Sequence, residues 1–239
     1  VLMSSVSAIS AADANATDVQ TADVEDVELE QSDSNQDVLS ATYSFSDLND
    51  LINSSTGSEI QLDDDYTFRT SNDDNSLTVD KDNVVIDGKG HTIEGSRNLN
   101  YPAYGFNVTS KNVVIKNINF VSLGSTYKNR DGGAILSSAL GSNLTVINCT
   151  FYYCYGKWGG AISDARLVDN CTFDFCYAEL GGAIATSSSV INSKFTRCNA
   201  REGGALSQCS AVNCIFKDNQ AGLGGAARMG TFINCTFDD

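Results

Sequence analysis

The sequence predicts an all-β fold, a right-handed parallel β-helix with a short N-terminal capping helix, and two interleaved repeats carry the prediction. A Gly-Gly-Ala motif recurs at steps of 22, 22 and 21 residues after a longer first step. An Asn-Cys-Thr-Phe-like motif alternates with it at steps of 22, 22, 21 and 21 residues. The motifs begin at Gly132, Gly159, Gly181, Gly203 and Gly224, and at Asn148, Asn170, Asn192, Asn213 and Asn234. A fixed short period is typical of solenoids.

Residue type decides which solenoid this is. Each period holds two short β-type runs, and no stretch of ten residues has the apolar spacing of a helix. The Leu-x-x-Leu-x-Leu frame of leucine-rich repeats is also missing from the sequence. A parallel β-helix of about 21–22 residues per coil remains, with strands about 4.8 Å from those of the previous coil.

Stacking turns each column of the repeat into a row in space. We expect Ile147, Cys149 and Phe151, with their equivalents in later coils, to point inward, because alternate residues of a strand share one face. An earlier coil has Ile118 where the others have Cys. The Asn column should form a ladder of side-chain amides. The Gly-Gly pair should supply positive φ at a corner of the coil.

These motifs resemble the repeats of polymorphic outer-membrane proteins, which carry Gly-Gly-Ala-Ile and Phe-x-x-Asn, and the adhesin-like surface proteins of methanogenic archaea. The likeness covers residues 43–239, and it implies a β-helix displayed at the cell surface behind a signal peptide. Phe216 and Asn219 keep the Phe-x-x-Asn pattern, but three coils have Cys154, Cys176 or Cys198 in place of the Asn. The resemblance implies no particular ligand.

The N-terminal part divides by composition. Residues 1–14 end in small residues and are predicted to be the remnant of a secretory signal peptide, with a disordered start as the alternative. Residues 15–42 are acidic and without aromatic side chains, so we predict a disordered linker. Residues 1–42 carry nine acids and no base, whereas residues 81–239 carry twelve acids and fourteen bases. The absence of a basic stripe argues against partners that are nucleic acids, and no direct membrane insertion is expected.

Residues 43–239 are predicted to form the β-helix, with an N-terminal cap at 43–68 and regular coils at about 77–239, where the sequence stops within a coil. Ser46 is a suitable N-cap residue, and Phe45, Leu48, Leu51 and Ile52 fall on one helical face. A short amphipathic helix here would cover strand edges at the open end of the solenoid.

The sequence indicates no catalytic, cofactor or metal site. His91 is the single histidine and lies in a first-coil turn phrase, and the Asp63–Asp65 run lacks the Gly and alternating oxygen ligands of a calcium loop. Some β-helices are polysaccharide lyases or glycosidases, which need clustered carboxylates for acid–base work, or calcium and a basic residue. The acids of these coils do not repeat in one column: Asp164, Asp169, Asp174, Glu179 and Glu202.

Eight cysteines allow three interpretations. Four share one column (Cys149, Cys171, Cys214 and Cys235), three share another (Cys154, Cys176 and Cys198), and Cys209 stands apart. An even number in a secreted chain suggests disulfides. Parallel Cβ atoms about 4.8 Å apart are at or beyond the usual disulfide range. Stacked buried thiols therefore explain the cysteine columns as well as disulfides do, and a zinc site is the weakest of the three interpretations.

Two regions are candidates for ligand contact. Aromatic side chains gather after the Phe of two coils, where they either grip sugar rings or shield a turn. Extra residues at 121–131 and 136–143 form either functional protrusions or neutral insertions. The predicted contact residues are Tyr127, Lys128, Arg130, Tyr152, Tyr155, Trp158, Phe175 and Tyr177.

We therefore expect a secreted, extracellular adhesin-like protein whose partner is a cell-surface glycan or a protein of another cell. A long lateral surface without catalytic motifs is suited to such binding. A polysaccharide-active enzyme and a structural stalk are the alternatives. Lys157, Glu179 and Arg201 form a charged column that should favour in-register stacking.

Overall fold

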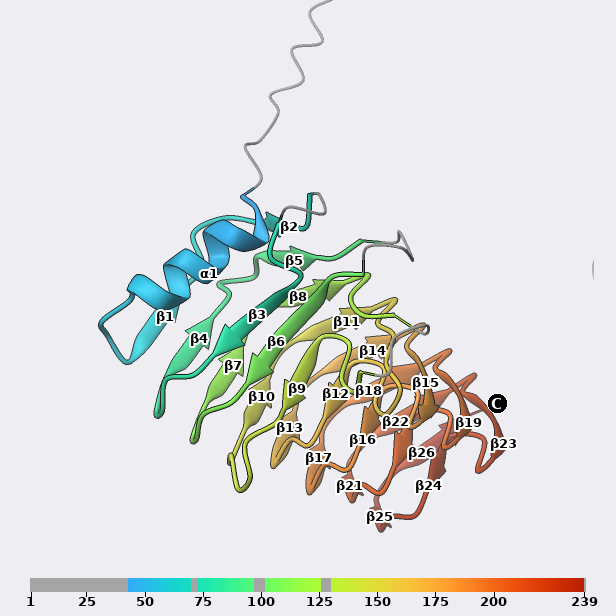
Figure 1. Ribbon diagram of the computed structural model, residues 1–239. Coiled ribbons are helices and arrows are strands. Elements are labelled where there is room, and N and C mark those ends of the chain that lie inside the picture. The colour runs from blue at the N-terminus through green and yellow to red at the C-terminus, as the bar shows by residue number, and fades with distance from the viewer. Residues whose placement is uncertain (1–42, 70–72, 97–101, 126–129, 239) are drawn as a thin grey trace, which may run out of the picture. The chain divides into compact units, whose positions relative to one another are not determined.

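A computed structural model describes residues 43–69, 73–96, 102–125 and 130–238, and it shows a parallel β-solenoid (Figure 1). Helix α1 (Phe45–Ser54) precedes strands β1 to β26 in these ranges. Strands pair in parallel with their equivalents in neighbouring coils. The predicted signal remnant and linker lie outside the described residues.

The strands form four sheets, numbered here 1 to 4. Sheet 1 contains β1 (Glu59–Gln61), β4 (Val85–Asp87), β7 (Val114–Lys116), β10 (Thr145–Ile147), β13 (Leu167–Asp169), β17 (Ser189–Ile191), β21 (Ala211–Val212) and β25 (Phe232–Ile233). Sheet 2 contains β2 (Tyr66–Thr67), β5 (Thr92–Glu94), β8 (Asn119–Val121), β11 (Thr150–Tyr152), β14 (Thr172–Asp174), β18 (Lys194–Thr196), β22 (Ile215–Lys217) and β26 (Thr236–Asp238). Sheet 3 contains β3 (Ser76–Val79), β6 (Tyr104–Val108), β9 (Ile135–Ser137), β12 (Ile162–Ser163), β16 (Ile184–Ala185), β20 (Leu206–Ser207) and β24 (Ala227–Arg228). Sheet 4 contains β15 (Tyr177–Leu180), β19 (Asn199–Glu202) and β23 (Gln220–Leu223).

The strand register confirms the predicted coil length. Thr145 pairs with Leu167, and Leu167 pairs with Ser189, which are steps of 22 residues. Val190 pairs with Ala211, a step of 21 residues. Each repeat of the sequence therefore makes one turn of the solenoid.

A column of phenylalanine rings fills the core, as predicted. From Phe120 to Phe216, successive ring centroids lie 4.7–5.0 Å apart and neighbouring ring planes are within 9° of parallel. These rings are fully buried, whereas Phe237 in the last coil is half-exposed. The core thus repeats one packing arrangement from coil to coil.

The expectation that Ile147 points inward is wrong. Val146 is fully buried and Ile147 only partly, and the same shift places Val168 in the core of the next coil. Asn148 is the reason, because its φ of 52° turns the chain between β10 and β11. Val146 is therefore the last inward residue before the corner and Cys149 the first one after it. The alternation of inward and outward residues does not continue through the corner.

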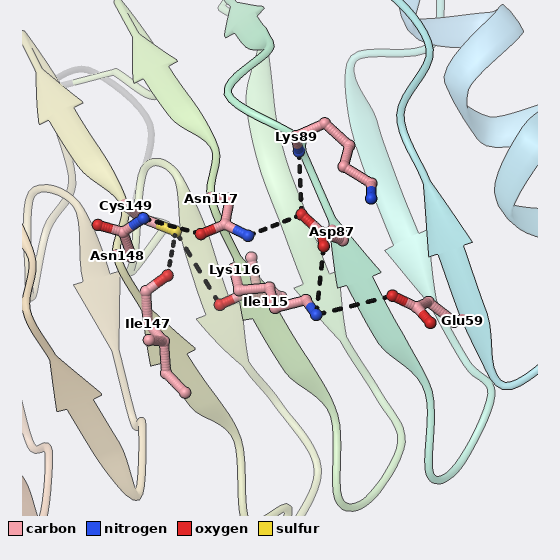
Figure 2. A network of polar contacts seen from close by, with 9 residues as sticks. All are labelled: Glu59, Asp87, Lys89, Ile115, Lys116, Asn117, Ile147, Asn148 and Cys149. Atoms are coloured by element: carbon pink, nitrogen blue, oxygen red, sulfur yellow. Dashed lines mark hydrogen bonds and ion pairs between the residues drawn. The ribbon is translucent and has the colours of Figure 1, made fainter.

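The asparagines at this corner form the predicted amide ladder. Asn117 Nδ2 donates to Asp87 Oδ1 at 2.8 Å, and Asn148 Nδ2 donates to Asn117 Oδ1 at 2.8 Å (Figure 2). Later coils continue the pattern, except that one amide bonds an aspartate of the previous coil instead. A second ladder, which the repeats did not indicate, joins Asn83, Asn112 and Asn143.

Asp87 is the last residue of the first ladder, and its carboxylate accepts hydrogen bonds from several donors. The Lys89 N–H donates to it at 3.0 Å, and Lys116 Nζ lies 3.2 Å from its carboxylate and 3.6 Å from that of Glu59 (Figure 2). Burial acts to raise the pKa of Asp87, but the bonds from Asn117, Lys89 and Lys116 together hold that pKa below its usual value.

The two glycines of each pair have different roles. The first has φ between 57° and 67° in all five copies, which an L side chain adopts only at a cost. In the first four pairs the second leaves no room for a side chain, since a Cβ on Gly182, for example, would lie 2.0 Å from the Gly204 carbonyl oxygen, whereas Gly225 in the last pair has no such close neighbour. Positive φ explains the first glycine, and close approach of the next coil explains the second.

Helix α1 forms where predicted, but its N-cap is Ser44 and not Ser46. Ser44 and Asp47 bond reciprocally in a capping box, while Ser46 Oγ donates to Asp73 at 2.8 Å. At the other end, Lys81 Nζ donates to three carbonyl oxygens of residues 52, 53 and 55 at 2.6–2.9 Å. The helix buries Phe45, Leu48 and Ile52 and is bonded at both ends by residues flanking β3.

All eight cysteines are free thiols, and seven of them are buried. The two predicted columns exist, with their sulfurs directed at backbone carbonyls: Cys149 Sγ lies 3.3 Å from the Ile147 oxygen (Figure 2). Burial raises the pKa of Cys209 to about 12 and that of Cys214 to about 11. These groups are core thiols rather than nucleophiles.

Candidate functional site

A groove follows the outer corner where the chain passes from sheet 2 to sheet 4. Each coil contributes a corner residue with positive φ, then a buried residue, then an outward residue. The corner column is Ser122, Tyr153, Phe175, Arg197 and Asp218. The outward residues pair from coil to coil as a strand column, Gly124, Tyr155, Tyr177, Asn199 and Gln220. The hollow of the groove has a volume of about 420 Å³ and spans three coils, lined by Tyr153, Tyr155, Phe175, Cys176, Tyr177, Arg197 and Asn199.

The corner column carries unusual side chains for its backbone conformation. Tyr153, Phe175 and Arg197 have φ of 52°, 53° and 51°, where bulky residues are rarely found. Their N–H groups bond carbonyl oxygens of the next coil at 3.0–3.2 Å, so the solenoid itself imposes this turn. Such a residue costs on the order of 1–3 kcal/mol. The next coil has Asp218 there, a residue type that adopts this conformation more readily.

The corner side chains stack on one another. The Tyr153 and Phe175 rings lie 5.0 Å apart and 6° from parallel, and Arg197 Cζ lies 4.0 Å from the centre of the Phe175 ring. Tyr152 packs edge-on against Tyr153 at 4.4 Å. Both faces of Phe175 are thus covered, and Phe175 offers a ligand only its edge. For this residue the geometry favours turn packing over face stacking with a sugar.

Arg197 is held in place by Asp174. Its Nε donates to Asp174 Oδ1 at 3.0 Å, and its Nη2 donates to the second carboxylate oxygen. The hydrogen bond to Asp174 raises the pKa of Arg197 above its usual value. The guanidinium is therefore fixed by an ion pair on its edge and by Phe175 on its face, and its remaining N–H groups can serve a ligand.

The predicted contact residues do not all meet. Tyr155, Phe175 and Tyr177 line the groove, and Tyr152 lies beside it. Trp158, which is 41% exposed, lies outside the groove lining and pairs with Leu180 at the far end of the sheet 4 strands. Tyr127 and Lys128 lie outside the described residues.

The Arg130 side chain is partly buried. Its guanidinium covers the Tyr104 ring at 4.3 Å, and its Nη2 atom is buried without a hydrogen-bond partner. Burial lowers the pKa of Arg130. Its carbonyl oxygen accepts from the Lys157 N–H at 2.9 Å, which joins this segment to the edge of sheet 4. The side chain of Arg130 folds back on β6, and its contact with a ligand stays a prediction.

Sequence reasoning missed Arg197 and Asn199 in the groove. Tyr155, Tyr177 and Asn199 occupy one column two residues after the corner, so the coil period could have aligned them. The contact residues at this corner were predicted from aromatic side chains alone, so the polar Asn199 in the same column was not included. The column in which the sequence departs from the Phe-x-x-Asn motif is buried, whether it carries Cys176 or Asn219. The Asn219 side-chain amide makes two hydrogen bonds to the backbone of the previous coil, both at 3.0 Å. Its Oδ1 accepts from the Cys198 N–H, and its Nδ2 donates to the Phe195 carbonyl oxygen.

A second hollow lies under the inserted residues 138–143. It has a volume of about 570 Å³, and five of its twelve lining residues are Ser or Thr, with Asp164 and Arg166 on the next coil. The exposed tip of the insertion is Leu140. The insertion thus forms a wall above the corner between sheets 3 and 1.

The groove itself lacks the groups that acid–base hydrolysis needs. None of its seven lining residues carries a carboxylate. In the ranges that the structure describes, no cluster of three His, Cys, Asp or Glu side chains is arranged to hold a metal ion. No helix within those ranges is long and apolar enough to cross a membrane.

Comparison with known proteins yields no match to this chain among family models, curated proteins or solved structures.

Proposed function

We propose that this chain is an adhesin-like β-helix of the cell surface that binds glycans along the corner groove and the adjoining face of sheet 4. One observation carries the proposal: large side chains occupy left-handed corners beside a groove of about 420 Å³. Strain of this kind persists where the surrounding structure imposes it, and it clusters at binding sites. Exposed Tyr177 and Trp158 add aromatic area that can contact sugar C–H groups.

The proposal includes the architecture and the location of the protein. We take the coils to wind right-handed, as the resemblance to polymorphic outer-membrane proteins and archaeal adhesin-like proteins implies. We take α1 to cap the N-terminal end, which is supported by the bonds from Asp73 and Lys81 to its two ends. The signal-like residues 1–14 support secretion.

Paired aromatic variants test the binding face. Tyr155→Ala with Trp158→Ala should weaken binding to a glycan array or to cells by roughly 1–3 kcal/mol, the value of burying one large side chain. This corresponds to roughly 5- to 150-fold in affinity. Tyr43→Ala is the matched control, because Tyr43 is 43% exposed but lies before α1, where it bridges to Tyr66 far from the groove residues in the sequence.

Thermal stability of the double variant decides between the two interpretations of the aromatic side chains. We expect a small loss, since both residues lie outside the buried Phe column. Unchanged binding together with a large loss of stability would show that these side chains shield the turn, and the proposal for this face would fall.

A further inference from the structure

We infer that the groove takes a linear chain of uncharged sugar rings that lies along the stack of coils, with one ring to each coil. The chain's third ring would lie at Arg197 and Asn199. This inference rests on the proposed function, because it assumes a glycan. It adds the direction of the ligand, its minimum length and its charge.

The direction follows from which residues line the groove. Three successive coils supply equivalent positions: Tyr153 with Tyr155, Phe175 with Tyr177, and Arg197 with Asn199. Two of these pairs are aromatic and the third is polar. The groove therefore runs across the coils, parallel to the solenoid axis, and it changes from apolar to polar along its length.

The spacing of the coils selects among extended ligands. Neighbouring strands lie about 4.8 Å apart, and one pyranose ring with its glycosidic oxygen is about as long as this step. The Tyr153 and Phe175 rings show the same step, 5.0 Å between centroids. Side chains on one face of an extended peptide repeat every ~6.6 Å, so a peptide loses register within two coils. A linear glycan can place one ring at each coil.

The first two coils offer apolar edges and phenolic groups. Because Phe175 has both faces covered, sugar rings there would meet ring edges on the corner side and the Tyr155 and Tyr177 side chains on the strand side. The floor is the buried Cys176. These contacts suit the C–H groups of a pyranose and do not distinguish one hydroxyl pattern from another.

The third coil offers directional hydrogen bonds. Arg197 has five N–H donors, of which Asp174 takes two. Asn199 donates to Gln220 Oε1 at 3.3 Å, which leaves its own Oδ1 as an acceptor. A donor and an acceptor on adjacent groove walls match the neighbouring hydroxyl groups of a sugar ring.

The charge balance favours an uncharged chain. Asp174 already neutralises Arg197, so a uronate carboxylate would have to compete with a two-point ion pair. The other lining residues are neutral. Unlike a site built for acidic sugars, this groove has no unpaired cation among its lining residues.

The test is calorimetric titration of the chain with oligosaccharides of one to six units. Four uncharged series are used, the oligomers of glucose, mannose, xylose and N-acetylglucosamine, together with oligogalacturonates as the charged series. In at least one uncharged series we expect affinity to rise at least tenfold from one unit to three, with little gain beyond four. Galacturonates of equal length should bind more weakly.

Variants locate the third ring. Arg197→Gln and Asn199→Ala should each lower the affinity for the trisaccharide more than the affinity for the disaccharide. Lys217→Ala is the control, since Lys217 is exposed on sheet 2 and pairs with Asp238.

The outcomes separate the two proposals. Glycan binding without length dependence, a preference for galacturonates, or equal losses for all lengths would overturn this inference and leave the proposed function in place. Binding to no series and to no glycan array or cell would overturn the proposed function, and this inference with it.

Discussion

Replacing Phe175 by Asn separates a binding corner from a structural one. Phe175 and Phe173 belong to the same coil and lie two residues apart, but Phe173 is buried in the core and Phe175 sits at the left-handed corner. Asn accepts positive φ readily, so the Phe175→Asn variant removes the aromatic ring and most of the backbone strain together. Phe173→Ala serves as the comparison.

The magnitudes follow from the contacts. Removing the Phe175 ring loses two aromatic pairs, with Tyr153 and Tyr152, of about 0.5–1.5 kcal/mol each, one cation–π contact of about 0.5–1 kcal/mol and about 1 kcal/mol of partial burial. Relief of the left-handed strain returns about 1–2 kcal/mol. The net loss of unfolding free energy should be about 2 kcal/mol. Phe173→Ala leaves a cavity between rings at 4.7 and 4.8 Å and should cost about 3–5 kcal/mol.

Urea unfolding, followed by circular dichroism, measures both variants against the parent chain. The urea midpoint should shift less for Phe175→Asn than for Phe173→Ala. Glycan binding, measured where both variants are still folded, should be weakened in Phe175→Asn and unchanged in Phe173→Ala. A loss near that of Phe173→Ala would refute the reasoning, because it would show that the corner stack is a major source of stability and the strain is small.

Three further predictions concern the fold. Asp87 has a lowered pKa in the folded state, so its stabilisation is complete above its unfolded pKa of about 3.9 and is lost as pH falls through the folded value. Asp87→Asn should flatten the fall in urea midpoint below about pH 4, and an unchanged slope would contradict this assignment. Lys81→Met should cost about 1–2 kcal/mol and speed amide exchange in residues 45–54, because three helix carbonyls lose their donor; unchanged exchange would argue against it. Alkylation in denaturant without reductant should label all eight cysteines, whereas the native chain should react slowly, and fewer than eight labels would reveal a disulfide.

The repeats were sufficient to predict the parallel solenoid, the coil length, the Phe column and the Asn ladder. Each of these depends on residues that recur once per coil, so a single period in the sequence implies a single position in space. The position of α1 was also readable, from the apolar spacing of Phe45, Leu48 and Ile52. In these elements the local sequence pattern and the stacking of the coils favour the same structure.

The tertiary structure decided the details that depend on corners and on contacts between coils. Alternation placed Ile147 in the core, but the left-handed turn at Asn148 put Val146 there instead. The N-cap is Ser44 and not the predicted Ser46, because Ser44 forms a capping box with Asp47. The Ser46 hydroxyl instead donates to Asp73, which lies far along the chain.

The same distinction applies to the candidate site. Aromatic clustering predicted that Tyr155, Phe175 and Tyr177 lie at one corner of the coil, but it did not indicate that Phe175 has both faces covered or that Arg130 folds onto Tyr104. It also gave no sign of Arg197 and Asn199 as groove residues. Sequence spacing determines which residues share a column, whereas the packing of neighbouring coils determines which atoms of that column a ligand can reach.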